Sequence, residues 1–472
     1  MGIKIHVKAL DREILRLALP SILANITVPL VGLVDTAVAG HLNAANGSCA
    51  EFIGGISVGA MILSVIYWNF AFLRASTGGL TAQAFGRAEL LSSTTDAGVS
   101  GECAAILKRA LKLSFGFAAL LLVAGWPISR LALFFRTATP GVAEFAIQYI
   151  LIRIWAAPAT LSLMALKGWF IGMQDTRSSM YTDLIVNVVN IVASIILTLG
   201  IGKWNGIGFY GIALGTVIAQ YTGLLTAAVI CIRKYRILAV CSEKRDQGTD
   251  TRNFFNLNTD LFIRSICFSG IYLGYTYLAS LYGETLLASA NIMMNLLMIF
   301  SYFTDGFAYA GEALTGRFIG EKDPVMLRSS VRATFRWSFG VAGFWVLIYL
   351  IAGPFMLDVM SSDKGLIDTC SRYLPWLLVM PLVGCAAFTW DGIYIGATAS
   401  KGIRNSMIAA LLVFIAVWFA GLVLLRALAG PSGVAPTTAI HLLMAAYFAH
   451  LLARSVWLTL RCHKDIYFAL QE

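Results

Sequence analysis

Charged residues are scarce in this chain. Only 13% of its 472 residues are Asp, Glu, Lys or Arg, and 58% are hydrophobic, whereas soluble proteins carry about 25% charged residues. No stretch is both long enough and polar enough to form a water-soluble domain. A soluble fold of this length has no place for so much apolar surface, but a lipid bilayer does. The composition therefore indicates an integral membrane protein and excludes a soluble enzyme or binding domain.

Motifs of enzymes and metal sites are missing as well. The sequence has no HExxH zinc motif and no Walker phosphate-binding loop, which argues against an ATP-driven pump unless a partner supplies the ATPase. The eight cysteines form no CxxC pair, and the five histidines lie scattered or near the ends of apolar runs. We therefore expect no cofactor, no metal site and no enzymatic activity, because a membrane-embedded enzyme would need a polar cluster at mid-membrane.

Glycine, by contrast, is abundant, with 43 residues. The segment 55–59 spells the G-x-S-x-G pattern of hydrolases, but that motif needs a strand-to-helix turn and this segment lies inside an apolar run. We interpret it as a GxxxG face for close helix packing. The same spacing occurs at Gly211/Gly215, Gly270/Gly274 and Gly392/Gly396.

Twelve apolar runs are long enough to cross a bilayer as helices, at ~1.5 Å per residue and ~30 Å of hydrocarbon. The predicted fold class is an all-α polytopic membrane protein with twelve transmembrane helices. The predicted spans are 14–40, 52–73, 111–134, 145–166, 184–201, 207–231, 261–282, 285–309, 335–357, 373–396, 407–426 and 439–460.

The basic residues indicate the orientation of these spans. The formal net charge is +10, and most of the lysines and arginines fall in loops on the side of the N-terminus. The positive-inside rule then places both termini in the cytoplasm, in a bacterial inner membrane. Because the charge is explained by topology, we expect contact with membrane lipids and no nucleic-acid partner. The N-terminus leads directly into the first span, so we expect no cleavable signal peptide.

A polar segment near the middle of the chain suggests two halves. We predict an N-terminal six-helix lobe over residues 1–231, a cytoplasmic linker over 232–260 and a C-terminal six-helix lobe over 261–472. Since each half has six spans, the two lobes have the same orientation and are parallel repeats.

Two pairs of motifs support this repeat. GGLTAQAFG (78–86) resembles EALTGRFIG (312–320), and GWFIG (168–172) resembles GIYIG (392–396). Each pair occupies matching places in the two halves, as an internal duplication requires.

Asp35 is the most informative polar residue, because it lies inside the first apolar span with no basic residue close to it on that helix. A charged group in a membrane is costly, so a functional role is the first hypothesis. Burial favours the neutral form of a carboxyl group, so Asp35 could take up and release a proton. Pro20 and Pro29 in the same span can bend the helix. The alternative role for Asp35 is a structural hydrogen bond to a neighbouring helix.

Further polar residues lie on the fifth and sixth spans. Asn187, Asn190 and Ser194 share one face of the fifth predicted helix, and Thr216 lies on the sixth. They could face Asp35 across a cavity of the first half. The alternative is that they are hydrogen-bonding contacts between helices, worth about 0.6 kcal/mol each.

In the second half, the eighth span carries Asn291, Met293, Met294, Asn295 and Met298. Methionine-rich surfaces suit varied apolar ligands, so these residues are candidates for a substrate-binding cleft. A methionine stripe is more often plain packing, and both interpretations stay open.

Three acids of the second half lie near the cytoplasmic ends of their spans: Asp305, Glu312 and Asp391. They could form a cytoplasmic gate or pair with Arg317 or Arg404. We favour the structural role.

Together these segments resemble the MATE family, the multidrug and toxic compound extrusion transporters, and in particular its DinF-like branch. The resemblance covers nearly the whole chain, and its specificity comes from the order and spacing of the motifs. The matching segments are LPSILANITVPLVGLVDTAVAGHL (19–42), TGGLTAQAFG (77–86), YILIRIWAAPA (149–159), GWFIGMQDTRSSM (168–180), NIVASIILTLGIG (190–202), GIALGTVIAQ (211–220), TDGFAYAGEALTGRFIG (304–320) and DGIYIGATASKGIRNSM (391–407).

The resemblance implies two six-helix lobes around a central cleft, and export of small amphipathic or cationic compounds driven by inward flow of H⁺ or Na⁺. It implies that Asp35 is the coupling acid and that Pro20 is associated with bending of the first helix. It also implies that Asn190 and Thr216 belong to the same first-lobe site. We expect the transporter to act as a monomer.

Two departures from the family pattern bear on the coupling ion. The usual Asn-x-x-x-Asp of the fifth helix ends in Ser194, and the second-lobe cation site of the NorM-like branch is poorly matched, because Glu284 lies beyond the end of its helix. With one acid left in the first lobe, we predict H⁺ coupling by alternating access, with Na⁺ coupling as the alternative. A lipid-linked precursor flippase is a further alternative, but Arg153 is the one deep basic candidate for binding a pyrophosphate.

Overall fold

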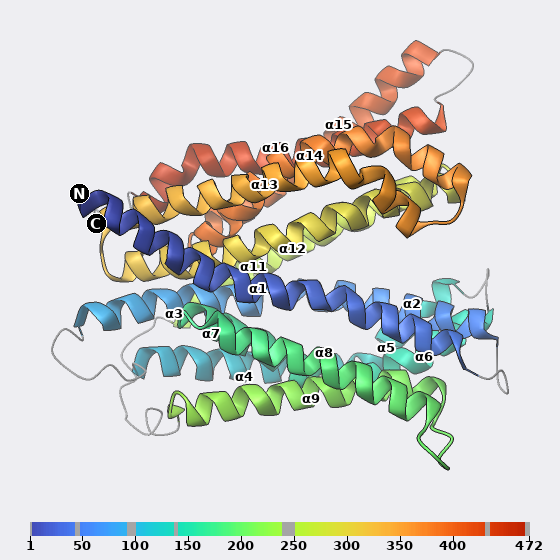
Figure 1. The fold of residues 1–472 in the computed structure, drawn as a ribbon, viewed down its shortest axis with the longest axis horizontal. Helices are drawn as coiled ribbons and strands as arrows, with labels where there is room; N and C mark the ends of the chain where they lie inside the picture. Colours follow the sequence, from blue (N-terminus) through green and yellow to red (C-terminus); the bar gives the residue numbers. More distant parts are fainter. Residues whose placement is uncertain are drawn as a thin grey trace. The chain divides into compact units, whose positions relative to one another are not determined.

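In the computed structural model of this chain, the structure describes residues 2–42, 48–91, 101–135, 140–237, 251–429 and 435–467. Within these ranges the regular elements are helices, apart from one isolated bridge between Ile201 and Trp204 (Figure 1). The helices are α1 (Gly2–Gly40), α2 (Cys49–Asn69), α3 (Phe72–Leu91), α4 (Gly101–Val123), α5 (Gly125–Ser129), η2 (Arg130–Phe135), α6 (Pro140–Arg153), η3 (Ile154–Ala156), α7 (Ala157–Gly172), α8 (Thr176–Leu199), α9 (Phe209–Arg233), α11 (Thr251–Ser280), α12 (Glu284–Gly320), α13 (Pro324–Met360), α14 (Lys364–Gly396), α15 (Ser400–Ala429), α16 (Pro436–Cys462) and η5 (His463–Tyr467).

The described helices include ten spans that are long and apolar enough to cross a membrane. An eleventh arises when the pair Gly101–Val123 and Gly125–Phe134, bent by 62°, counts as one broken span. Proline and glycine are common causes of such bends, and Pro127 lies just after this one. The remaining predicted span, 261–282, falls largely within α11, a helix of 30 residues whose first half carries several polar side chains.

The chain divides into two compact units. One unit contains Met1–Ile22 together with Arg252–Glu472, and the other contains Leu23–Thr251. The first half of α1 therefore groups with the helices of the C-terminal half, whereas the sequence analysis placed all of residues 1–231 in one lobe. Of the predicted linker 232–260, residues 238–250 lie outside the described residues, and residues 251–260 belong to α11.

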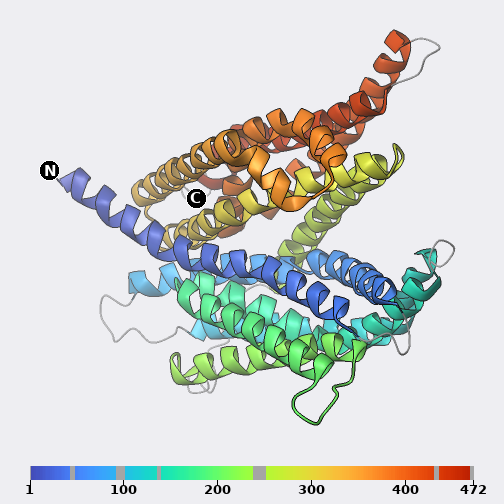
Figure 2. The same cartoon turned by 45° about the vertical axis from the view of Figure 1, so that its right-hand side comes forward.

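Among the close helix contacts of the described residues, one pair in each unit corresponds to a pair in the other. In α7, a Cβ atom added at Gly168 would lie 2.1 Å from the carbonyl oxygen of Arg74 on α3. In α14, a Cβ atom at Gly392 would lie 2.0 Å from the carbonyl oxygen of Ala308 on α12. Only glycine permits this approach. The repeated motifs of the sequence thus make the same backbone contact in both units. Figures 1 and 2 show the course of the helices of both units from two directions.

The turns that follow these two helices are also alike. Gln174 after α7 has φ 60° and Thr398 after α14 has φ 53°, a left-handed conformation that is uncommon for residues other than glycine. In both turns the next backbone N–H donates to the carbonyl five residues before it, at 2.8 Å and 3.0 Å. The duplication therefore extends to local backbone geometry.

The other predicted GxxxG faces differ in outcome. A Cβ atom at Gly59 would lie 2.6 Å from a tyrosine ring of α6, and one at Gly215 would lie 2.7 Å from the backbone nitrogen of Ser194 on α8. These two faces pack closely, as predicted. The prediction for Gly270 and Gly274 is wrong, because Cβ atoms there would have their nearest neighbours at 3.9 Å and 3.5 Å, which is ordinary contact.

Candidate functional site

Asp35 lies in the second half of α1, in the part of the helix that belongs to the unit Leu23–Thr251. The residue is 6% exposed, and its Oδ1 atom has no hydrogen-bond partner among the described residues. A buried carboxylate with an unsatisfied oxygen is costly while it is charged. Taking up a proton removes that charge, so Asp35 is chemically suited to bind and release one.

The polar residues predicted on the fifth and sixth spans meet each other. Asn190 on α8 donates from Nδ2 to Thr216 Oγ1 on α9 at 3.0 Å, and Ser194 donates from Oγ to Asn190 Oδ1 at 3.4 Å. All three residues are buried. Gly215 precedes Thr216 and lets α9 approach α8 closely, which places these side chains together. Ser194 in turn lies within interaction range of Asp35, so these residues and the acid form one cluster.

Asn187 makes a separate contact with α1. It donates from Nδ2 to Thr27 Oγ1 at 2.6 Å, and Thr27 itself donates to the carbonyl of Ala24 at 2.7 Å. The helix α1 continues without interruption through Pro20 and Pro29, and it passes from one unit to the other between Ile22 and Leu23, just after Pro20. Helix α8 therefore holds α1 by a side-chain hydrogen bond at a point between its two prolines, before the buried acid.

Three residues of this site were not predicted. Arg153 at the end of α6 donates from Nη1 to Tyr149 Oη at 2.6 Å, and its guanidinium lies 5.4 Å from the centre of that ring. Arg153 also interacts electrostatically with Asp35 and with Tyr67 of α2. The signal in the sequence was an arginine inside an apolar run with a tyrosine four residues before it. The sequence analysis considered this arginine only as a possible pyrophosphate ligand.

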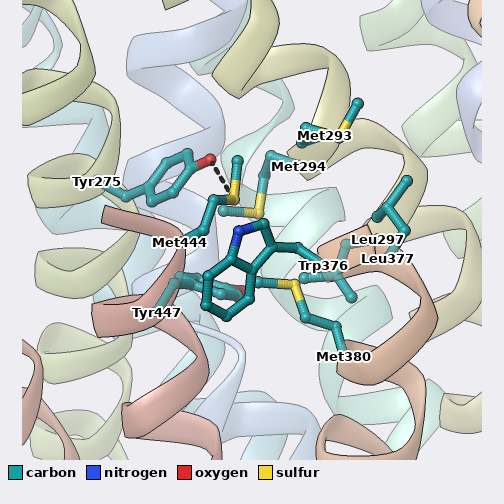
Figure 3. Close-up of a pocket in the computed structure, with 9 residues that line it drawn as sticks. All are labelled: Tyr275, Met293, Met294, Leu297, Trp376, Leu377, Met380, Met444 and Tyr447. Carbon is teal, nitrogen blue, oxygen red and sulfur yellow. Dashed lines mark hydrogen bonds between the residues drawn. The ribbon is translucent and has the colours of Figure 1, made fainter. Parts of the chain in front are cut away.

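The methionine-rich segment of α12 does not form one surface. Met293 and Met294 are buried against Tyr275, Trp376 and Met444, around a cavity of about 10 Å³. Figure 3 shows the thioether groups among these aromatic rings, and the Tyr275 hydroxyl donates to the Met444 sulfur at 3.3 Å. A cavity of this size has room for about one water molecule, so in this structure these methionines pack a core.

The other candidates of that segment lie elsewhere on the helix. Asn295 is exposed, Asn291 is half-buried, and the Met298 sulfur receives a contact from the Ser301 hydroxyl at 3.8 Å. The five predicted cleft residues are therefore divided between the core and the surface of α12.

Asp391 is held by two arginines. Its Oδ2 atom accepts from Arg264 Nη2 on α11 and from Arg454 Nη2 on α16, each at 2.5 Å. The predicted partners of Asp391 are thus wrong. Arg404 instead pairs with Asp260 at 2.6 Å. Two guanidinium groups keep Asp391 ionised, so its arrangement is that of a structural ion cluster.

The two remaining candidate acids lie on α12 and differ in burial. Glu312 is completely buried, and its backbone carbonyl faces Gly396 of α14. Asp305 is half-buried. Among the described residues, no three His, Cys, Asp or Glu side chains gather in a group that could hold a metal ion.

Comparison with known proteins gives the family of this chain. The MatE family model matches residues 20–196 and 261–402. The chain is a member of the MatE family. It is 35% identical over 404 residues to DNA damage-inducible protein F of Escherichia coli, covering 85% of this chain and 83% of that protein. It is 22% identical to a probable multidrug resistance protein NorM of Photorhabdus laumondii, covering 75% of each.

The fold agrees with this assignment. A transporter of the MOP superfamily from Pyrococcus furiosus superposes with a TM-score of 0.80 at 16% sequence identity, over 98% of this chain and 97% of that one. The predicted MATE family, its DinF-like branch and the all-helical multi-pass fold are confirmed. The chain therefore belongs to a family of membrane transporters for multidrug and toxin efflux, with small-molecule substrates, and not to a family of enzymes.

Proposed function

We propose that this MatE family member exports amphipathic or cationic small molecules in exchange for protons, and that Asp35 carries the proton. The observation that carries the proposal is the burial of Asp35 in a membrane span with one oxygen unpaired among the described residues. The cluster of Asn190, Ser194 and Thr216 beside it supplies neutral polar groups that can contact either form of the acid.

The chemistry of this cluster favours H⁺ over Na⁺. A proton needs one carboxylate oxygen, whereas a hard cation in a dry site needs several oxygen ligands. Ser194 stands where the family motif has a second acid, so the site lacks a second negative charge to offset that of Na⁺.

In this proposal protonation and deprotonation of Asp35 change the shape of α1, near Pro20 and Pro29, and so alternate the side to which the substrate site opens. Prolines free backbone carbonyls and permit such bending at low cost. The positive-inside count and the bacterial relatives support an inner membrane location with cytoplasmic termini.

The available energy is sufficient. One charge crossing 150 mV releases about 3.5 kcal/mol, at ~2.3 kcal/mol per 100 mV. Since a tenfold gradient costs ~1.4 kcal/mol, one proton can sustain a gradient of a few hundredfold for a neutral solute. For a singly charged cation exchanged for one proton, the electrical work cancels and the pH difference alone drives export, about tenfold per pH unit.

The test is transport of ethidium in proteoliposomes with pH and Na⁺ varied independently. We expect a pH gradient to drive export by the parent, Asp35→Asn to lose that response, and the exposed-site control Asp368→Asn to behave as the parent. If Asp35→Asn exports as well as the parent, Asp35 is not the coupling group. If a Na⁺ gradient at uniform pH drives export, Na⁺ is the coupling ion instead.

A further inference from the structure

A small cavity in the C-terminal half is lined largely by thioether groups and aromatic rings. Three methionines from different helices form part of its wall: Met294 on α12, Met380 on α14 and Met444 on α16. In Figure 3 these three side chains converge on the indole of Trp376, whereas Met293 extends away from it. The cavity has a volume of about 10 Å³. It therefore has room for one small guest among soft, polarisable groups.

The three thioethers are held at this cavity by helix packing. Met294, Met380 and Met444 are all buried in the core of their unit. Trp376 lies one helical turn before Met380 on α14, so the two side chains share a face of that helix. The fold brings these side chains together from three helices, and their spacing along the chain does not reveal the arrangement.

The hydrogen bonds around the cavity leave the Met444 sulfur free to change partner. The Tyr275 hydroxyl has two acceptors within reach, the Met444 sulfur at 3.3 Å and the carbonyl oxygen of Ala290 at 3.2 Å. A hydroxyl has one hydrogen to donate, so the carbonyl can accept it when the sulfur binds something else. The Trp376 N–H donates to His441 Nδ1 at 3.1 Å. A guest bound by the sulfur therefore leaves neither of these donors unpaired.

The chemistry of the lining selects one class of guest. Thioethers are soft, neutral ligands that favour Cu⁺ and ions like it, whereas Na⁺, Mg²⁺ and Ca²⁺ need several oxygen ligands. None of the described residues that line the cavity is an acid, so a doubly charged ion would stay uncompensated in an apolar site, at high cost. A single positive charge costs less, and the ring of Trp376 attracts it. The cavity thus fits a soft monovalent metal ion.

We propose that Met294, Met380 and Met444 bind one soft monovalent metal ion, Cu⁺ or Ag⁺, beside the ring of Trp376. Such a d¹⁰ ion has no strong geometric preference of its own, so it accepts the ligand directions that the packing provides. The site belongs to the unit that contains Arg252–Glu472, whereas Asp35 belongs to the other unit. The proposal goes beyond the proposed function and does not depend on it.

The test is a titration of the full-length protein in detergent with Ag⁺, a redox-inert probe, followed by NMR of ¹³C-labelled methionine methyl groups. The eight cysteines can also take up Ag⁺, so accessible thiols are first blocked with N-ethylmaleimide, and the signal reports on methionines alone. We expect three of the fourteen methionine signals to shift together and to saturate with one bound ion. Single Met→Leu substitutions assign them to Met294, Met380 and Met444.

Two of these variants also measure the contribution of single ligands. Leucine nearly conserves the volume of methionine, so Met294→Leu and Met444→Leu keep the packing and lose one sulfur each. We expect each to weaken Ag⁺ binding at least tenfold, since loss of a mere second-shell partner already costs about 10- to 100-fold. The matched control is Met298→Leu on the same helix, whose sulfur contacts the Ser301 hydroxyl and does not line the cavity. It should bind Ag⁺ as the parent does.

Several results would overturn the proposal. If Ag⁺ shifts none of the three signals, the bound ion sits on thiols and the cavity is only packing. If Met444→Leu binds Ag⁺ as tightly as the parent, the ligand set is wrong. Na⁺ at the same concentration should leave all methionine signals in place, and an equal response to it would contradict a soft-metal site. If a variant is not recovered as monodisperse protein, the joint shift of three signals in the parent decides the question.

Discussion

Substituting Asp391 tests whether the ion cluster of the C-terminal half is structural. Asp391 joins α14 to Arg264 on α11 and Arg454 on α16 through one carboxylate oxygen, at 2.5 Å to each. Arg454 is 1% exposed. The parent cluster has one negative and two positive charges, and Asp391→Asn leaves two positive charges facing each other with no carboxylate between them.

The structure indicates a large cost for that change. Breaking a buried ion pair costs about 3–5 kcal/mol, because the remaining charge stays desolvated and unpaired. For a domain of about 200 residues, this lowers the melting temperature by on the order of 10 °C. Asp260→Asn is a graded comparison, since it releases the Ser400 hydroxyl and Arg404, whose side chain is 30% exposed and can reach water. We expect a smaller loss there.

The assay is the fraction of detergent-purified protein that remains monodisperse after heating. The double variant Asp391→Asn/Arg454→Gln removes one positive charge together with the carboxylate, so it should recover most of the lost stability. It should also export ethidium in response to a pH gradient, because Asp391 has no coupling role in this reasoning.

Two results would refute it. If Asp391→Asn melts as the parent does, the two arginines do not depend on the carboxylate and the cluster is not structural. If the double variant is stable but no longer exports, Asp391 takes part in coupling, and the assignment of coupling to the N-terminal half alone is wrong.

Two further predictions concern packing and the N-terminal end of α8. Gly392→Ala should lower the melting temperature by several degrees, because the added Cβ atom would lie 2.0 Å from a backbone carbonyl of α12 and overpacking costs about 1–3 kcal/mol. The control is Gly340→Ala, whose added Cβ atom would have no other atom within 4 Å. We expect that variant to be neutral or stabilising by up to about 1 kcal/mol. Burial raises the pKa of Asp175, but hydrogen bonds from Lys234 and Tyr235 outweigh it and hold the pKa below its usual value. The ionised Asp175 therefore contributes stability to the folded protein above the unfolded pKa of about 4, and this contribution is lost as pH falls through the lower folded pKa. Asp175→Asn should destabilise the protein at pH 7 and make its stability depend less on pH at the acid end. Thermal melting of both proteins between pH 3 and 7 measures this.

Much of the fold follows from patterns within single helices. Apolar runs predict the spans, and the glycine motifs at Gly168 and Gly392 predict close packing, since these signals depend on residues of one element. The helical spacing of Asn190 and Ser194 likewise predicts that they share a face. Their hydrogen-bond partner on α9, however, depends on how tightly Gly215 lets two helices approach.

Partners across the fold were harder to predict. Asp391 meets Arg264 and Arg454 because α11 and α16 pack around α14, and distance along the chain carries no information about this arrangement. The sequence analysis considered Arg153 only as a possible pyrophosphate ligand, because the chain pattern does not show which side chains it meets. Its neighbour Asp35 is far away in sequence, so their interaction appears only in the folded chain.

The two halves share a scaffold but differ in the sign of the charge at corresponding positions. Lys167 precedes Gly168 in the first glycine motif, and Asp391 precedes Gly392 in the second. Each charged side chain is neutralised within its own unit, Lys167 by Asp183 and Asp391 by two arginines. The duplicated helix contact therefore tolerates either sign of charge, provided that neighbouring helices supply the opposite sign.

Asp35 differs from both of these positions. One oxygen of its carboxylate has no hydrogen-bond partner among the described residues, and no ion pair joins Asp35 to a basic side chain within them. An acid fixed between two guanidinium groups cannot lose its charge at physiological pH, whereas an acid that is only partly compensated can. Under the proposed function, this difference in compensation, rather than burial itself, distinguishes Asp35 from Asp391 as the group that couples proton movement to transport.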